Sequence, residues 1–228
     1  MRTGAFAVGS VLALALALAA PCVFAQQQAE KPKMTAEQQA AMEAWMNVAT
    51  PGEGHKALEP TIGSWNVTST LWETPTSPAQ KGTGTSENTW VLGGRFVRQD
   101  SQGEFGGMKF QGLGYSGYDN FKKKYVGTWM DTMGTMIMVM TGTADPSGKV
   151  FTATSTMDDV VTGKPMKVRT VTRIVDANKH VMEMFGPDRS GKEFKMMEIV
   201  YTRKGLRPAC SGPKSSRVPP PAGRGISS

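Results

Sequence analysis

Methionines alternate along two short segments of this sequence. Met136, Met138 and Met140 are spaced two residues apart, as are Met182 and Met184. Side chains two residues apart in a β-strand lie on one face, so each set would present a row of thioethers. Thioether sulfur is a soft ligand that selects Cu(I), but methionine also fills irregular apolar space. The spacing favours the wall of a core or cavity, with Cu(I) binding as the alternative.

A second group of residues combines aromatic rings with charge. Its members are Arg98, Tyr125, Trp129, Asp131, Glu183 and Glu198. Fixed polar groups among apolar side chains could orient an amphipathic ligand such as a fatty acid. Inward-facing charges would need partners, so surface ladders or a buried salt-bridge network are the alternative. With the three alternating methionines of residues 136–140, these six are the candidate ligand-binding residues.

The sequence has few residues that could support a metal site, a haem site or a catalytic triad. The chain has two histidines, His55 and His180, and two cysteines, Cys22 and Cys210. These are too few for a closed zinc site, and a haem site needs a histidine facing a large pocket. We expect no metal, no cofactor and no Ser-His-Asp triad. An acid–base enzyme that uses Asp131 with a glutamate stays open as an alternative.

The segment Gly112–Asp131 is expected to form the element that positions several of these residues. Two alternating runs flank a polar turn at Asp119 and Asn120, which is typical of a β-hairpin. Glycine inside a strand marks a bend or a close approach by another group. Several glycines in one hairpin indicate a strongly curved sheet.

Further runs of this kind follow from residue 62 onward, separated by Gly, Asp, Asn and Pro. The predicted strands are Ile62–Glu73, Gly84–Leu92, Arg95–Ser101, Met108–Tyr118, Lys124–Thr132, Thr135–Thr143, Val150–Met157, Met166–Val175, His180–Phe185 and Glu193–Arg203. About ten short strands without intervening helices predict an all-β, antiparallel up-and-down barrel, because closure removes the sheet edges. A β-sandwich is the alternative.

One helix is predicted before the strands, over residues 35–48. Thr35 and Gln38 form a capping-box pattern, and Pro51 ends the periodic segment. We expect this helix to pack against the domain or over one barrel opening. With the strands it gives one folded domain, residues 35–204.

The two ends of the chain have a different composition. Residues 1–25 carry Arg2, an apolar run and a Val23-Phe24-Ala25 ending, which predicts a cleaved signal peptide and a secreted or periplasmic protein without a transmembrane segment. Residues 26–34 are a polar linker, and residues 205–228 are a basic Pro/Gly/Ser-rich tail; both are expected to be disordered. Residues 26–203 hold 20 basic against 19 acidic residues, so no nucleic-acid partner is expected.

Four ordered motifs carry a family resemblance. HKALEPTIGSW from His55, LGGRFVRQD from Leu92, GYDNFKKKYVGTWMD from Gly117 and KMMEIVYTRK from Lys195 resemble the bacterial domain-of-unknown-function 1579 family. The Gly63-Ser64-Trp65 segment also resembles the opening of lipocalins and other calycin barrels. That resemblance implies a tryptophan plug at Trp65 with Arg203 over its ring. The resemblance to the domain-of-unknown-function 1579 family supplies no catalytic residues.

Together these observations favour a non-enzymatic protein that binds a small apolar or amphipathic ligand inside a barrel. The alternatives are an enzyme that uses Asp131, a Cu(I)-binding protein, and an interaction protein of the cell envelope. The sequence leaves the oligomeric state open.

Overall fold

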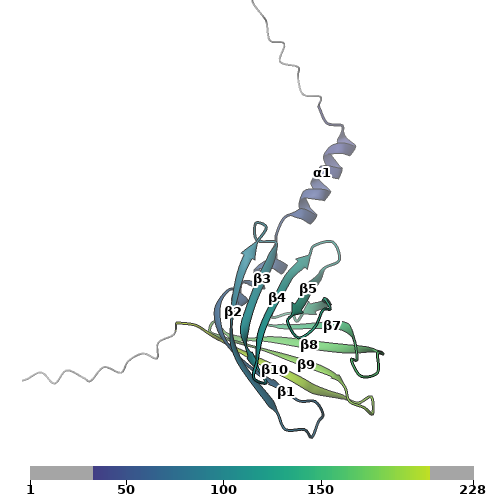
Figure 1. Ribbon diagram of the computed structural model, residues 1–228. Helices are drawn as coiled ribbons and strands as arrows, with labels where there is room; N and C mark the ends of the chain where they lie inside the picture. The colour runs from purple at the N-terminus through teal and green to yellow at the C-terminus, as the bar shows by residue number, and fades with distance from the viewer. Residues whose placement is uncertain (1–32, 206–228) are drawn as a thin grey trace, which may run out of the picture.

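The computed structural model describes residues 33–205, which form a ten-stranded closed barrel preceded by helices (Figure 1). The expected signal peptide, most of the linker, and the tail with Cys210 lie outside the described residues.

The elements follow the chain in a simple order. The helical elements are α1 (Ala36–Ala49), α2 (Glu53–Lys56) and the 3-10 turn η1 (Glu59–Thr61). The strands are β1 (Gly63–Leu71), β2 (Gln80–Val91), β3 (Phe96–Phe105), β4 (Met108–Asp119), β5 (Lys124–Asp131), β6 (Met138–Ala144), β7 (Val150–Asp158), β8 (Pro165–Asp176), β9 (Lys179–Pro187) and β10 (Glu193–Arg203).

Each strand pairs antiparallel with the next, and β10 returns to pair with β1. The closing seam runs from Trp65 opposite Arg203 to Leu71 opposite Met197. The predicted up-and-down barrel is confirmed, and the sandwich alternative is wrong. Closure leaves no unpaired edge strand, which protects a sheet of this length from pairing with other chains.

The hairpin of β4 and β5 forms where the sequence predicted it. The Asp119 carboxylate accepts hydrogen bonds from the backbone N–H groups of Phe121 and Lys122, each at 2.9 Å, and so fixes the turn. Residues 112 to 119 then pair in register with residues 131 to 124.

The strand predicted from Thr135 begins later, at Met138. The Asp131 carboxylate accepts a hydrogen bond from the backbone N–H of Met133 at 2.9 Å, which turns the chain away from the ladder. Met136 therefore lies in the connection between β5 and β6, and its side chain is exposed.

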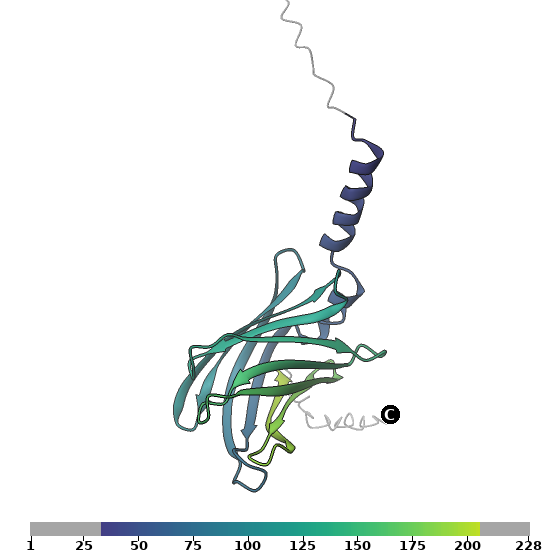
Figure 2. The ribbon, with the colours of Figure 1, turned by 90° about the vertical axis from the view of Figure 1, so that its right-hand side faces the viewer.

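Helix α1 begins after Thr35 with the expected capping box and ends before Pro51. None of its residues is buried, and both views show it pointing away from the strands (Figures 1 and 2). The expectation that it packs on the barrel is wrong. Its anchor is at its end, where the Asn120 amide donates to the carbonyls of Val48 and Thr50. Within residues 33–205, no helix combines the length and apolar character needed to cross a bilayer.

Candidate functional site

The inward faces of the strands are identified by side chains that meet across the barrel. The Gln99 amide on β3 donates to the Tyr201 hydroxyl on β10 at 3.2 Å, although these strands are not neighbours. Residues directly opposite each other on paired strands share a face. Following the register from Gln99 around the barrel therefore gives every strand an inward and an outward set.

Trp65 closes one end of the barrel. Its side chain is completely buried, and its indole N–H donates to the Thr61 carbonyl at 2.9 Å. The Arg203 guanidinium lies 4.3 Å above the ring, a favourable cation–π contact. The same guanidinium donates to the carbonyls of Ile62 and Ala177 at 2.9 and 2.8 Å. One arginine thus ties the start of β1 to the connection between β8 and β9.

Gly63 is required where β1 starts. Its φ is +116°, which side-chain-bearing residues rarely adopt, and a Cβ here would lie 2.5 Å from Nη1 of Arg203. The backbone can therefore pass beneath the guanidinium only without a side chain.

The segment of α2 and η1 covers the same end from outside. His55 is buried edge-on against Tyr118, with ring centroids 5.9 Å apart, and its Nδ1 accepts a hydrogen bond from the Gly52 N–H. The Asn88 amide donates to the Thr61 carbonyl at 2.8 Å, which fixes η1 to the inner wall. This end is therefore sealed by backbone, aromatic rings and Arg203.

His180 lies just inside the seal. Its ring stacks on that of Tyr201, with centroids 4.2 Å apart, and makes a T-shaped contact with that of Trp65, with centroids 4.4 Å apart. Burial, together with a smaller contribution from the nearby Arg203 charge, lowers the pKa of His180 to about 4. The imidazole is consequently neutral at pH 7 and adds no charge to the interior.

A strip of polar side chains runs from the sealed end along the inner face of β2 and β3. The Ser86 hydroxyl donates to Oδ1 of the Asn88 side chain at 2.8 Å, and the Ser101 hydroxyl donates to the Ser86 hydroxyl oxygen at 3.3 Å. Gln99 continues the strip to Tyr201. These groups satisfy one another, so this side of the interior is polar but uncharged.

The opposite side of the interior is lined by methionine. Met138 and Met184 are buried with Val168 on the inward faces of β6, β9 and β8. Six further methionines pack against them: Met140, Met157, Met166, Met182, Met196 and Met197. These eight side chains, from β6 to β10, are called the methionine wall below. Six of them are only partly buried although the barrel is closed around them. By register, Met157 and Met166 lie beside the β7–β8 connection, at the end opposite Trp65.

Trp129 separates the methionine wall from the inner face of β4. Its indole lies against Gly112 and Gly114; a Cβ on Gly114 would approach its Cε3 to 2.8 Å. The Trp129 ring also packs against Met138 and its cluster. The glycines of the central hairpin therefore make room for an aromatic side chain.

Apart from Met136, which lies in the connection between β5 and β6, the structure divides the candidate residues into two sets. Tyr125, Trp129, Asp131, Met138 and Met140 face inward by register. Tyr125 lies near the sealed end, where its ring is 4.9 Å from those of Tyr118 and Phe151, and burial raises its pKa.

The other charged candidates, Arg98, Glu183 and Glu198, lie on the outer wall. Arg98 pairs with Asp100 at 2.7 Å, and both side chains are exposed. Glu183 binds Arg173 and Lys195, and Lys195 also binds Glu198 at 2.5 Å. Burial alone would raise the pKa of Glu183, but these hydrogen bonds outweigh it and hold the pKa below its usual range. These groups form surface ion pairs and leave the interior without a cation to receive a carboxylate.

Asp131 stands without a second carboxylate. Its Oδ2 accepts the indole N–H of Trp129 at 2.8 Å, while Oδ1 accepts the N–H of Met133. On the described strands, no other Asp or Glu faces inward by register. The acid–base hypothesis, which needs paired carboxylates in one cavity, gains no support from this arrangement.

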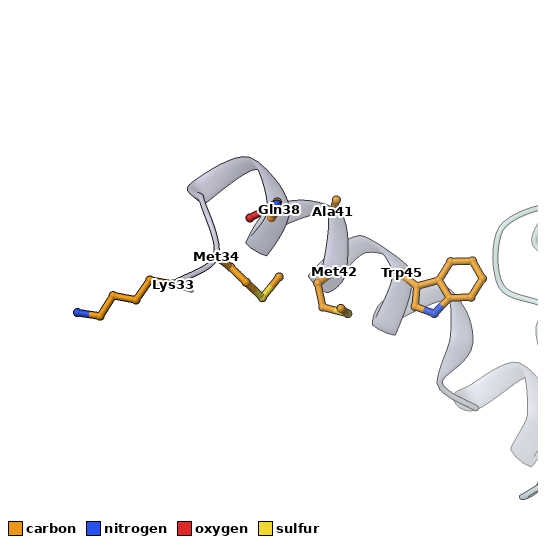
Figure 3. A pocket seen from close by; sticks show the side chains of 6 residues that line it. All are labelled: Lys33, Met34, Gln38, Ala41, Met42 and Trp45. Atoms are coloured by element: carbon orange, nitrogen blue, oxygen red, sulfur yellow. The ribbon is translucent and has the colours of Figure 1, made fainter. Parts of the chain in front are cut away.

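Two surface features outside the barrel interior are hollowed. One is a shallow pocket along α1, lined by residues that include Met34, Met42 and Trp45 (Figure 3). The other is an open groove of about 600 Å³ whose lining includes the outward-facing Glu87, Asp100, Leu113 and Met130. The α1 pocket is lined mainly by apolar side chains of one exposed helix, and the groove lining mixes polar, charged and apolar groups.

Several interior residues were not singled out by the sequence patterns. Met157 and Met166 stand at the two sides of the connection between β7 and β8, and Met196 and Met197 fall at a bulge in β10. Alternation cannot group residues on different strands. Parity counted outward from each predicted turn is the signal that could have placed Met157 opposite Met166.

One solved structure supports the barrel fold. The crystal structure of Rv2717c from M. tuberculosis matches with a TM-score of 0.52 and 16% identity, over 68% of this chain and all of that one. A redesigned β-barrel, mFAP1, bound to DFHBI, has a TM-score of 0.34 and 13% identity, over 67% of this chain and all of that one. No curated protein sequence matches the chain.

A family model covers the barrel and its sealing segment. It is described as a protein of unknown function, DUF1579, and it matches residues 50–203. The matched region begins after α1 and includes Trp65, the methionine wall and Arg203. The chain belongs to the DUF1579 family.

Proposed function

We propose that the barrel binds a small, neutral, apolar or amphipathic molecule that enters from the end opposite Trp65. The observation that carries this proposal is the methionine wall: eight flexible apolar side chains on the inner faces of β6 to β10, most of them partly accessible. Methionine has three rotatable bonds and a polarizable sulfur, so it adapts to ligands of varied shape. A Gly/Ser surface on β2 to β4 lies across from it.

The charge distribution sets the class of ligand. Arg203 is committed to Trp65 and to backbone carbonyls at the sealed end, and His180 is neutral. Arg98 and Lys195 lie on the outer wall in ion pairs. A ligand carboxylate would lose its hydration without gaining a cationic partner, which disfavours a fatty acid anion. A neutral molecule meets no such penalty.

We place this binding outside the cytoplasm. The support is the composition of residues 1–25, which is typical of a signal peptide cleaved after Ala25. Expression of the full chain in a Gram-negative host should then yield a periplasmic protein that begins at Gln26. Native mass spectrometry of that protein would report the mature mass and any co-purified ligand together.

Blocking the interior should abolish binding. Ser101 points inward from β3, and Ser101→Phe places a ring across from the methionine wall. We expect the Kd for the neutral fluorescent probe N-phenyl-1-naphthylamine to rise at least about tenfold, since overlap with the ring removes contact area worth 1.4 kcal/mol or more. Probe fluorescence in a titration measures this.

Gln102→Phe is the matched control. Gln102 is the next residue of β3, faces outward and is exposed, so the same substitution there leaves the interior unchanged. Equal probe affinity in both variants, or no probe binding by the unaltered protein, would count against a ligand site within the barrel.

A second candidate, Cu(I) binding, is favoured by one specific observation. The place that a Gly186 side chain would occupy lies 2.7 Å from Sδ of Met196 and 3.9 Å from Sδ of Met166. Two thioethers therefore face the same point on the methionine wall, and Cu(I) prefers such soft ligands.

If the protein binds Cu(I), the purified protein should withdraw Cu(I) from bicinchoninate. Met166→Leu with Met196→Leu should weaken Cu(I) binding about tenfold or more, because leucine conserves the apolar volume but has no sulfur lone pair. Met46→Leu with Met130→Leu provides the control, because Met46 lies on α1 and Met130 faces outward from β5. Absence of competition by the unaltered protein would eliminate the candidate.

A further inference from the structure

We propose that the hydroxyls of Ser155 and Thr170 form a polar subsite that binds a neutral hydroxyl group of the ligand. This inference rests on the proposed binding function and adds the chemical class, an apolar molecule bearing an alcohol.

The two residues lie on neighbouring strands and face the interior. In the register of β7 and β8, Ala153 is opposite Thr170 and Ser155 is opposite Val168. Ser155 and Thr170 are therefore diagonal neighbours on one face, with Cβ atoms about 7 Å apart. One ligand oxygen that displaces the side chains packed over the pair could reach both hydroxyls.

Neither hydroxyl has a hydrogen-bond partner among the described residues. Ser155 is 7% exposed and Thr170 is 8% exposed, and both side-chain oxygens are cut off from solvent. Buried hydroxyls normally bind a backbone carbonyl or another side chain, as Ser86 and Ser101 do on the opposite wall. The pair on β7 and β8 is an exception within the same barrel.

The surroundings of the pair are apolar. Met184 is opposite Thr170 on β9, and Val168, opposite Ser155, is 1% exposed. Both Met184 and Val168 belong to the central cluster of the methionine wall. An unpaired hydroxyl in such a place opposes folding, whereas valine or alanine would pack there without that penalty. Residues that fit the fold poorly are expected at functional sites, where a ligand supplies the missing partner.

The hydroxyls also limit what the ligand can be. A serine or threonine hydroxyl both donates and accepts, so a ligand hydroxyl can donate to one and accept from the other. No charged side chain faces them from β6, β8 or β9 by register, which excludes pairing with an ionised group. Within residues 33–205, His180 Nδ1 is also buried without a partner, but it lies at the sealed end between Trp65 and Tyr201.

The test compares two isomers of equal size and charge in displacing N-phenyl-1-naphthylamine. Octan-1-ol should displace the probe at about tenfold lower concentration than 1-methoxyheptane, because the ether accepts but cannot donate. In the double variant Ser155→Ala/Thr170→Val this preference should fall to about one when both competitors are compared against that variant's own Kd for the probe. The melting temperature of the ligand-free double variant should rise by a few degrees.

Thr154→Val/Thr156→Ala, at exposed outward positions of β7, is the control and should leave both readouts unaltered. Probe binding without any preference for the alcohol overturns the subsite alone and leaves the binding function standing. A melting temperature that falls in the double variant also overturns it, since the hydroxyls would then have partners in the free protein. Failure of the unaltered protein to bind the probe removes both the function and the subsite.

Discussion

Trp65→Ala should lower the free energy of unfolding by about 4 kcal/mol, which is the cost typical of truncating a fully buried tryptophan. Trp65 has no exposed surface, and its loss leaves a cavity beneath the sealing segment. Arg203 would lose its cation–π contact, and the Thr61 carbonyl would lose one of its two donors. Urea denaturation monitored by circular dichroism measures the change.

Trp45→Ala is the matched control, because the same substitution removes an indole that is 68% exposed on α1. Its effect should remain within about 0.5 kcal/mol, as for most surface substitutions. If the two variants were equally stable, Trp65 could not be the plug of the sealed end.

Acidification from pH 7 to pH 5 should cost about 2 kcal/mol of stability through His180. The folded pKa is about 4, whereas an unfolded histidine titrates near its ordinary value of 6.5. Below pH 6.5 the unfolded chain binds a proton that the folded protein excludes, so stability is present above that pH and is lost as the pH falls toward 4. Burial between Trp65 and Tyr201 is the main cause, and Arg203 adds to it.

His180→Phe separates this effect from other titrations. Phenylalanine keeps a ring between the two aromatic neighbours but cannot be protonated, so most of the slope between pH 7 and pH 5 should disappear. The carboxylates with lowered pKa, such as Glu183, titrate below their ordinary value of 4.5 and do not contribute in this range. His55 has a pKa lowered by burial and by Arg95, so a smaller slope of the same sign should persist. An unchanged slope in His180→Phe would contradict the assignment.

The local elements of this protein are determined by its sequence. Alternation and turn residues are short-range signals, so they located all ten strands and the turn at Asp119. The capping box at Thr35 is equally local, and it starts α1 as expected. The contact between Trp65 and Arg203, implied by the family resemblance, is also present.

Which face of each strand points inward was decided only by closure of the barrel. In the middle of β4, Gly112 and Gly114 face inward while Leu113 and Tyr115 face outward, so the hydrophobicity of that stretch alone would choose the wrong face. The reason is that Trp129, from the neighbouring strand, fills the space above the glycines. Arg98, Glu183 and Glu198 were candidates for the interior because alternation cannot tell its two faces apart.

The methionine wall and the Ser155–Thr170 pair likewise depend on tertiary structure. They combine residues from strands up to 59 positions apart, Met138 to Met197, which only the register of five strands brings together. A period of two tells which residues of one strand share a face, but it carries no information about neighbours on other strands. Pairing around a closed ring supplies that information, and with it the interior on which any binding function depends.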